Sequence, residues 1–275
     1  MKNASSMRDK LVNHLASYGG AAIAFNGDVD SILVAACLVE AVGSDKALAI
    51  TVVTDMHPVR ERKLAADMAA AVGIRQVECP VDVFAYPDII SNGSKRCYYC
   101  KKTLFTAMKN TARQEGFDVF LDGTDLDDTA GNRAGLKAIR EAGVQSPLAD
   151  MKFSKEDVRE VSQLMGLPGS LRNPLACLAT RLPAGKPITR GKMVQIDRAE
   201  DAIEAMGFVN VRVRHHGDLA RIELRHAEEI ARAATPDVAA EIAKQLREKC
   251  RFNFVTLDME GYRRSSVLAL PKEVE

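Results

Sequence analysis

Short apolar runs alternate with longer apolar or amphipathic stretches along the first two thirds of the chain. Ala21–Phe25 and Ala47–Thr54 have the length of buried strands, and Ile32–Val42 is apolar nearly all round, as a buried helix is. Further helices are predicted at residues 59–72, 102–115, 132–142 and 154–165, and further strands at residues 76–80 and 118–121. Ser154 is the predicted N-cap of the last helix, with Asp157 in its first turn. This alternation predicts an α/β fold.

The pattern changes after Pro168. Residues 169–189 are rich in Pro, Gly and Arg, with little periodicity, and are interpreted as a functional loop and linker. Helices at 190–206 and 236–249 and strands at 209–215, 220–224 and 252–257 follow. The chain is therefore predicted to have a larger α/β domain at residues 1–185 and a small α+β domain at residues 186–275.

Composition narrows the class of protein. With 38 Lys and Arg against 37 Asp and Glu, the net charge of +1 argues against a protein that coats nucleic acid. Residues 1–10 are polar, unlike a signal peptide, and the apolar runs are too short to span a membrane. We therefore expect a cytoplasmic protein with no membrane partner, whose six cysteines do not form a disulfide framework.

The turn between the first strand and the next helix is a candidate phosphate site. Free backbone N–H groups at a helix N-terminus bind phosphate. The predicted phosphate-binding residues are Asn26, Gly27, Asp28, Asp30 and Ser31. The alternative is an ordinary turn in which an Asp caps the helix.

Three cysteines form the second candidate site. Cys97 and Cys100 make a Cys-x-x-Cys pair, and Cys177 lies in the later Pro- and Gly-rich loop. Such a pair binds a metal or cluster or forms a redox disulfide. With Cys177 it would ligate three irons of a 4Fe–4S cluster and leave the fourth iron open. The alternative is a coincidental pair beside a helix.

Two further groups are polar. Gly123, Thr124 and Asp128 follow a predicted strand, and ligands of α/β sheets bind beyond the ends of strands. The acidic residues there would hold Mg²⁺. The alternative is a solvated acidic turn. Arg212 and Arg214 share one face of a strand and would bind a phosphate or carboxylate.

Taken in order, these segments resemble the LarE-type ATP-dependent sacrificial sulfur transferases, a branch of the PP-loop ATP pyrophosphatases. The resemblance runs from about residue 21 to residue 261. It is carried by Gly123-Thr124-x-x-Asp127-Asp128, Arg133-x-Gly135-Leu136, Gly143-Val144-x-Ser146-Pro147-Leu148, Gly166-Leu167-Pro168, Cys177-Leu178-Ala179-Thr180-Arg181-x-Pro183-x-Gly185, Ile188-Thr189, Arg212-Val213-Arg214-x-His216-Gly217, Ala220-Arg221-Ile222-Glu223 and Leu257-Asp258-x-x-Gly261-Tyr262-Arg263.

The resemblance implies a PP-loop, adenine nucleotide alpha hydrolase-like fold, with a parallel sheet and helices on both faces. It implies that ATP and Mg²⁺ activate a carboxylate of a pyridinium mononucleotide as an acyl-adenylate, with release of pyrophosphate. A sulfur nucleophile then displaces AMP and leaves a thiocarboxylate for the nickel-pincer nucleotide cofactor. In one branch the cysteine at the position of Cys177 loses its own sulfur. In the other, three cysteines hold a 4Fe–4S cluster that carries a transferable sulfide, and the presence of Cys97, Cys100 and Cys177 favours this branch.

On this reading Cys177 and Asp30 are the catalytic residues, and Gly27, Asp30 and Ser31 contact the phosphates. The predicted substrate contacts are Arg133, Arg181, Arg212, Arg214, Glu223 and Arg263. Glu223 would orient the arginines, although a simple ion pair on the strand face is an equal alternative. The family tends to form oligomers, so we expect a homo-oligomer.

One position departs from the family pattern. The family loop reads Ser-Gly-Gly-x-Asp-Ser, whereas Asp28 stands here in place of the second glycine. Two like charges 4 Å apart repel by about 4 kcal/mol at an effective dielectric of 20, so Asp28 would oppose phosphate unless it turns away and caps the helix. A sulfide or cluster carrier that no longer uses ATP is therefore one alternative. A second alternative keeps the fold and changes the substrate, as in a tRNA-thiolating enzyme.

Overall fold

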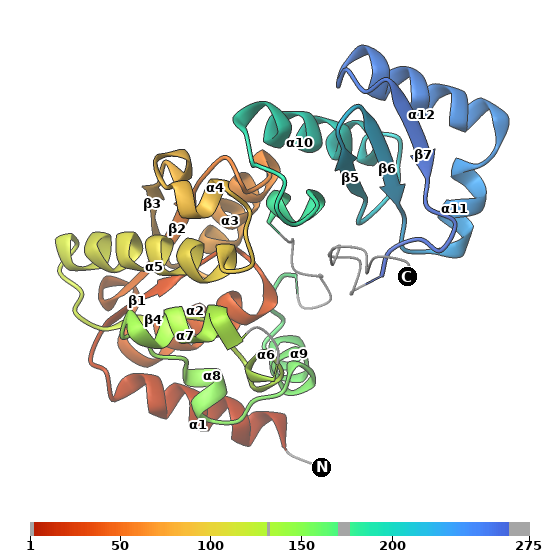
Figure 1. Cartoon of the computed structure of the whole chain (residues 1–275). Helices are drawn as coiled ribbons and strands as arrows, with labels where there is room; N and C mark the ends of the chain where they lie inside the picture. Colours follow the sequence, from red (N-terminus) through yellow and green to blue (C-terminus); the bar gives the residue numbers. More distant parts are fainter. Residues whose placement is uncertain (1–2, 131–132, 170–176, 264–275) are drawn as a thin grey trace. The chain divides into compact units, whose positions relative to one another are not determined.

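The computed structural model describes residues 3–130, 133–169 and 177–263, which form two compact units (Figure 1). Unit 1 comprises residues 1–54, 59–82 and 97–175, and unit 2 comprises residues 55–58, 83–96 and 176–275. Two short segments from the first part of the sequence thus belong to unit 2. The predicted domain boundary after residue 185 stays a prediction.

Unit 1 is built on a parallel sheet. Its strands are β1 (Ala21–Ala24), β2 (Ala47–Val53), β3 (Arg75–Pro80) and β4 (Phe120–Leu121), in the order β3-β2-β1-β4. Its helices are α1 (Ala4–Ala16), α2 (Val29–Val42), α3 (Val59–Ala71), α5 (Arg96–Gln114, with Arg96 counted in unit 2), α6 (Leu126–Thr129), α7 (Arg133–Glu141), α8 (Pro147–Asp150) and α9 (Lys155–Leu164), with a 3-10 turn at Ser44–Lys46.

Alternation along the strands divides the core of unit 1 between the two faces of the sheet. Ile23 and Ala49 pack in one cluster with Leu33 of α2 and Val158 of α9. On the other face the ring of Phe120 meets that of Phe105 in α5, with centroids 6.3 Å apart. The sheet is therefore flanked by helices, and the predicted α/β fold of the PP-loop class is confirmed.

Unit 2 contains the small mixed sheet. Strands β5 (Arg212–His216) and β6 (Leu219–Glu223) are antiparallel, and β7 (Phe254–Leu257) runs parallel to β6. Its helices are α4 (Pro87–Ile90), α10 (Arg190–Glu204), α11 (Ala227–Ala233) and α12 (Pro236–Glu248), with 3-10 turns η2 (Val83–Ala85) and η3 (Leu178–Arg181). Apolar residues of α10, α12 and the strands form its separate core.

Most predicted elements are present, with shifted ends. Ser154 caps α9 in a capping box with Asp157, as predicted. Helix α5 begins at Arg96 rather than at residue 102, because no Gly or Pro interrupts residues 96–114, and it therefore includes Cys97 and Cys100. Helix α11 and the four-residue helices α4, α6 and α8 were not predicted from the hydrophobic pattern. None of the helices in the described part of the chain is long and apolar enough to span a membrane.

The core of unit 1 gives a testable contrast between two leucines. Leu38 in α2 is fully buried, whereas Leu164 at the end of α9 is 55% exposed. We expect Leu38→Ala to lower the free energy of unfolding by about 2–5 kcal/mol, because it leaves a cavity. The control, Leu164→Ala, should change it by less than about 1 kcal/mol. Urea denaturation would measure both, and equal losses would contradict this packing.

Candidate functional site

The turn after β1 is closed by its own side chains. Asp28 is the N-cap of α2, and its Oδ1 accepts a hydrogen bond of 3.0 Å from the N–H of Ser31. Asn26 Oδ1 accepts a bond of 2.9 Å from the hydroxyl of Ser31, and its Nδ2 donates to Asp28 Oδ2 at 3.0 Å. Of the two orientations open to Asp28, the structure therefore has the helix-capping one, which occupies an amide that a phosphate would otherwise use.

Two glycines are required by the shape of this turn and of the turn after β4. Gly27 has φ of +73°, which favours glycine, and a Cβ there would lie 3.1 Å from the Cα of Ala65. A Cβ on Gly123 would lie 3.0 Å from the backbone N of Ser31 and 3.1 Å from Cβ of Asp30. Backbone from the two turns thus packs in direct contact, because β1 and β4 are neighbouring parallel strands.

A lysine joins the two turns electrostatically. Lys155, the first residue of α9, places its Nζ 2.5 Å from Asp30 Oδ2 and 2.8 Å from Asp125 Oδ2. Both aspartates are buried. Burial, followed by the charge of Asp28, raises the pKa of Asp30 to about 7, although Lys155 opposes the change. Burial lowers the pKa of Lys155 less than the two carboxylates raise it.

The remaining residues of the acidic segment have local partners. Thr124 donates from its hydroxyl to Asp122 Oδ2 at 2.6 Å. Asp128 forms a capping box with Asp125 at the start of α6. Arg133 begins α7, but its side chain lies outside the described residues. Their predicted contacts with nucleotide, Mg²⁺ and substrate stay predictions.

The residues of unit 1 fit a nucleotide with Mg²⁺. Asp30 Oδ1 is buried and has no hydrogen-bond partner among the described residues, so this edge retains an unused acceptor. Oxygen donors of this kind suit Mg²⁺, and the absence of a side chain at Gly123 lets its turn pack against Asp30 and Ser31. No group of three or more His, Cys, Asp or Glu residues has the geometry of a metal site in the part of the chain that the structure describes.

The cysteines are distributed over both units. Cys97 and Cys100, three residues apart on α5, lie on neighbouring positions of one helix surface and are half-buried. Cys177 immediately precedes η3 in unit 2 and is also half-buried. Thiols spaced in this way suit an iron–sulfur cluster, but the convergence of all three on one cluster stays a prediction. The other three cysteines, Cys37, Cys79 and Cys250, are buried.

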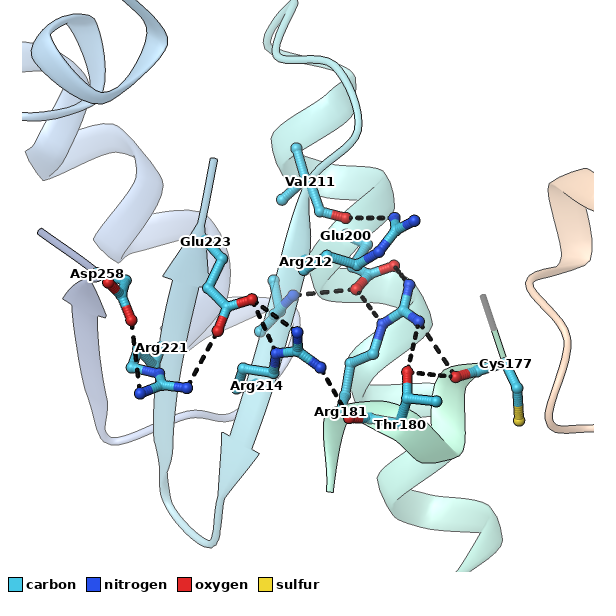
Figure 2. A network of polar contacts seen from close by, with 11 residues as sticks. Cys177, Thr180, Arg181, Glu200, Val211, Arg212, Arg214, Arg221, Glu223 and Asp258 are labelled. Carbon is cyan, nitrogen blue, oxygen red and sulfur yellow. Dashed lines mark hydrogen bonds and ion pairs between the residues drawn. The ribbon is translucent and has the colours of Figure 1, made fainter. Parts of the chain in front are cut away.

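The backbone at Cys177 is held by a buried ion pair (Figure 2). The carbonyl of Cys177 accepts hydrogen bonds from the Thr180 hydroxyl at 2.8 Å and from Arg181 Nη1 at 3.1 Å. Arg181 is fully buried and binds both oxygens of Glu200, at 2.8 and 2.9 Å. In Figure 2 the Sγ of Cys177 points away from these partners. The network therefore fixes the backbone at Cys177.

The two strand arginines also have hydrogen-bond partners within the protein. Arg214 binds Glu223 Oε2 through Nε and Nη2, at 2.9 and 2.8 Å, and donates to the carbonyl of Thr180 at 2.8 Å (Figure 2). Arg212 is buried and donates to the carbonyl of Val211 at 2.9 Å. Glu223 is fully buried and contacts two arginines, Arg214 and Arg221.

These contacts bear on the predicted substrate residues. Glu223 holds the Arg214 guanidinium in place, as an orienting carboxylate would, and the same contact is the ion pair that the alternative expected. Arg181 would reach a substrate only if its turn opened, because its side chain is completely buried. Arg263 is exposed and pairs with Glu260. Contact of these residues with a substrate stays a prediction.

Sequence reasoning missed Lys155 and Glu200, although each has a signal. A lysine at the first position of a helix opposes the helix dipole, so Lys155 is not placed there to stabilise α9. Glu200 occupies the apolar stripe of α10 between Ile196 and Ile203, where a charge requires a buried partner. Neither signal identifies the partner, because Asp30 and Arg181 come from other segments.

Comparison with known proteins gives relatives that cover both units. The chain is 30% identical over 263 residues to the pyridinium-3,5-bisthiocarboxylic acid mononucleotide synthase of Lactiplantibacillus plantarum, which covers 96% of this chain and 94% of that protein. It is 37% identical over 242 residues to an uncharacterized Synechocystis protein, covering 88% and 89% of the two chains. An uncharacterized Methanocaldococcus jannaschii protein is 28% identical over 241 residues, covering 88% and 90%. No family model matches the chain.

The buried pair of unit 2 is open to test by Glu200→Gln. We expect a loss of about 3 kcal/mol in the free energy of unfolding, because Arg181 keeps its buried charge without a counter-ion. Burial alone would raise the pKa of Glu200, but the charge and hydrogen bonds of Arg181 hold it below the ordinary value of a glutamate. The pKa of Glu200 is lower in the folded than in the unfolded state. The ion pair therefore stabilises the fold fully above the unfolded pKa, and this stabilisation is lost as the pH falls through the folded pKa.

Denaturation between pH 7 and pH 3 would measure the difference between wild type and Glu200→Gln, which should shrink at the acidic end. The matched control is Glu248→Gln, at the exposed end of α12 in the same unit, which should change stability by less than about 0.5 kcal/mol. If the difference in the free energy of unfolding between wild type and Glu200→Gln did not change with pH, the carboxylate charge of Glu200 would not be what stabilises the turn.

Proposed function

We propose that this chain, which belongs to the family of the pyridinium-3,5-bisthiocarboxylic acid mononucleotide synthases, the LarE-type sulfur transferases, is an ATP-dependent enzyme that converts a carboxylate of a pyridinium mononucleotide into a thiocarboxylate. The observation that carries the proposal is the match to the Lactiplantibacillus plantarum synthase across 96% of the chain, because it includes both the nucleotide-type turn and the Cys177 segment. The product would serve nickel-pincer nucleotide synthesis.

Activation of the carboxylate is assigned to unit 1. A carboxylate is a poor electrophile, and attack of its oxygen on the α-phosphorus of ATP would release pyrophosphate and leave a good leaving group, AMP. The turn of Asn26, Gly27 and Ser31 would bind the phosphates. Asp30 would hold Mg²⁺, which neutralises phosphate charge when bound, and its unpartnered Oδ1 supports this role.

Sulfur transfer is assigned to Cys177, with Cys97 and Cys100. A sulfur nucleophile would attack the carbonyl carbon of the acyl-adenylate, and AMP would leave. The three thiolates would hold a 4Fe–4S cluster, whose open iron would supply a replaceable sulfide; without it, the sulfur of Cys177 itself would be consumed. Fixing the carbonyl of Cys177 through Thr180 and Arg181 supports either route, because it restricts where Sγ can lie.

The substrate would be held by charge. Its phosphate and carboxylates are anionic, and the predicted contacts are Arg133, Arg181, Arg212, Arg214 and Arg263, with Glu223 as orienting carboxylate. Arg263 supports this assignment best, since its side chain is exposed, whereas Arg214 is buried and its guanidinium is held by Glu223 and the carbonyl of Thr180.

A second candidate is a sulfide or cluster carrier that no longer uses ATP. Asp28 favours it, because its carboxylate caps α2 and occupies the N–H of Ser31, which a phosphate would otherwise use. The two candidates differ in one measurable step, the release of pyrophosphate in the presence of the pyridinium mononucleotide.

Cys177→Ala tests the proposed division of labour. We expect the variant to release pyrophosphate from ATP and the pyridinium mononucleotide, but to form no thiocarboxylate, because activation is assigned to unit 1 and sulfur delivery to Cys177. Coupled pyrophosphate detection and mass spectrometry of the nucleotide product would measure the two steps. Thiocarboxylate formed by the variant would refute the role of Cys177, and wild type without pyrophosphate release would favour the carrier.

Cys97→Ala separates the two sulfur sources. If a cluster is the source, the variant should lose most of its bound iron and its multiple-turnover activity, because one of three thiolate ligands is missing. Iron analysis and the visible absorption of anaerobically purified protein measure the cluster directly. Cys37→Ala is the matched control, since Cys37 is a buried core thiol of the same unit and should leave the iron content unchanged. Normal single-turnover activity of Cys97→Ala without iron would reject the cluster.

A further inference from the structure

We propose that the ammonium group of Lys155 substitutes for a metal ion in the nucleotide-free protein, and that it moves to the nucleotide phosphates when Mg²⁺ binds Asp30. The proposal rests on the ATP-dependent function proposed above and adds to it a nucleotide-binding residue outside the turn. It concerns unit 1 alone.

The first support is the position of the lysine. Its Nζ lies within 2.8 Å of one oxygen of each of two carboxylates that the sheet brings together, Asp30 after β1 and Asp125 after β4. The side chains of Asp30 and Asp125 are 6% and 0% exposed, whereas that of Lys155 is 24% exposed. Mg²⁺ next to phosphates is commonly bound in a similar way, by one or two carboxylates on one side and by water on the other.

The second support is an acceptor that Lys155 leaves unused. Oδ1 of Asp30 is buried and finds no hydrogen-bond donor among the described residues. An unsatisfied buried carboxylate oxygen is unfavourable, and one ammonium group bonded to Oδ2 does not correct it. A hydrated divalent ion would engage Asp30 more completely, because it carries twice the charge and brings water molecules as donors.

The third support is the mobility that the position allows. Lys155 is the first residue of α9, and its backbone N–H donates to Asp127 Oδ2 at 2.8 Å. The backbone is therefore fixed, while a side chain with four methylene groups can rotate. A cation at a helix N-terminus also opposes the helix dipole, so the location of Lys155 is explained by the charges it reaches and not by helix stability.

Charge balance gives the exchange its direction. Asp28 and Asp128 add negative charge around the pair. A phosphate entering alone would meet carboxylates held by one ammonium group. When Mg²⁺ enters with the phosphate, it takes over Asp30 and frees the ammonium group for a phosphate oxygen, so each anion keeps a cation.

The test uses Lys155→Met in the full-length protein, with Lys63→Met as control, since Lys63 is an exposed residue of α3 in the same unit. In a calorimetric titration with MgCl₂ alone, the affinity of Lys155→Met for Mg²⁺ should be at least about tenfold higher than that of wild type. Titration with Mg-ATP should show binding to Lys155→Met that is weaker by a similar factor, about tenfold. Lys63→Met should match wild type in both titrations.

Thermal melting keeps the test decisive if the variant is unstable. Lys155→Met should melt below wild type without Mg²⁺ and recover on addition of MgCl₂, because the ion restores the missing cation. Lys155→Arg, which keeps the positive charge, should not acquire this response. A variant that stays unfolded or unchanged by MgCl₂ overturns the proposal, as does wild-type affinity of Lys155→Met for both Mg²⁺ and Mg-ATP.

The outcomes for the two proposals are distinguishable. If wild type binds Mg-ATP and Lys155→Met binds it equally well, the exchange is refuted while the ATP-dependent function stands. If no form of the protein binds Mg-ATP, the transfer of Lys155 to phosphate and the ATP-dependent function both fail, and a MgCl₂ response confined to Lys155→Met would still show the lysine substituting for a metal ion.

Discussion

The parallel pairing of β1 with β4 is the contact on which the candidate nucleotide site depends. These strands are far apart in sequence, yet Ala22 and Ile23 of β1 pair with Phe120 and Leu121 of β4. Parallel neighbours end at the same edge of a sheet, so the turn carrying Asp30 meets the turn carrying Gly123 and Asp125. The close approach at Gly123 and the bridge through Lys155 are consequences of this pairing.

In unit 2, buried ion pairs hold the η3 turn in place. Arg181 and Arg214 both tie η3 to the rest of the unit, the first through Glu200 of α10 and the second through Glu223 of β6. Burying ion pairs is expensive, and apolar residues would stabilise a core of this size as well or better. What the ion pairs provide is geometry, because each carboxylate takes two hydrogen bonds from one guanidinium group and so fixes the orientation of the groups that hold the carbonyls of Cys177 and Thr180.

The two units therefore use buried charge in different ways. In unit 1 a buried oxygen of Asp30 has no hydrogen-bond partner among the described residues, and Lys155 lies where the proposed exchange would place Mg²⁺. In unit 2 Arg181 and Arg214 are each paired with a buried glutamate, and the half-buried Cys177 lies at one end of the network. The proposed enzyme, which would first activate a carboxylate and then deliver sulfur, would use both arrangements.

Sequence alone is enough to predict the α/β fold class, most strands and helices, the Ser154 cap and the family resemblance, because hydrophobic periodicity and motif order are local properties. The remaining features depend on contacts between distant segments. Whether Asp28 repels phosphate or caps α2 depends on the backbone of one turn. That Lys155 meets Asp30, and Glu200 meets Arg181, depends on pairings between segments that no local pattern encodes. Charged residues in unfavourable local positions could be recognised from sequence, but their partners were fixed only by the packing of strands and helices.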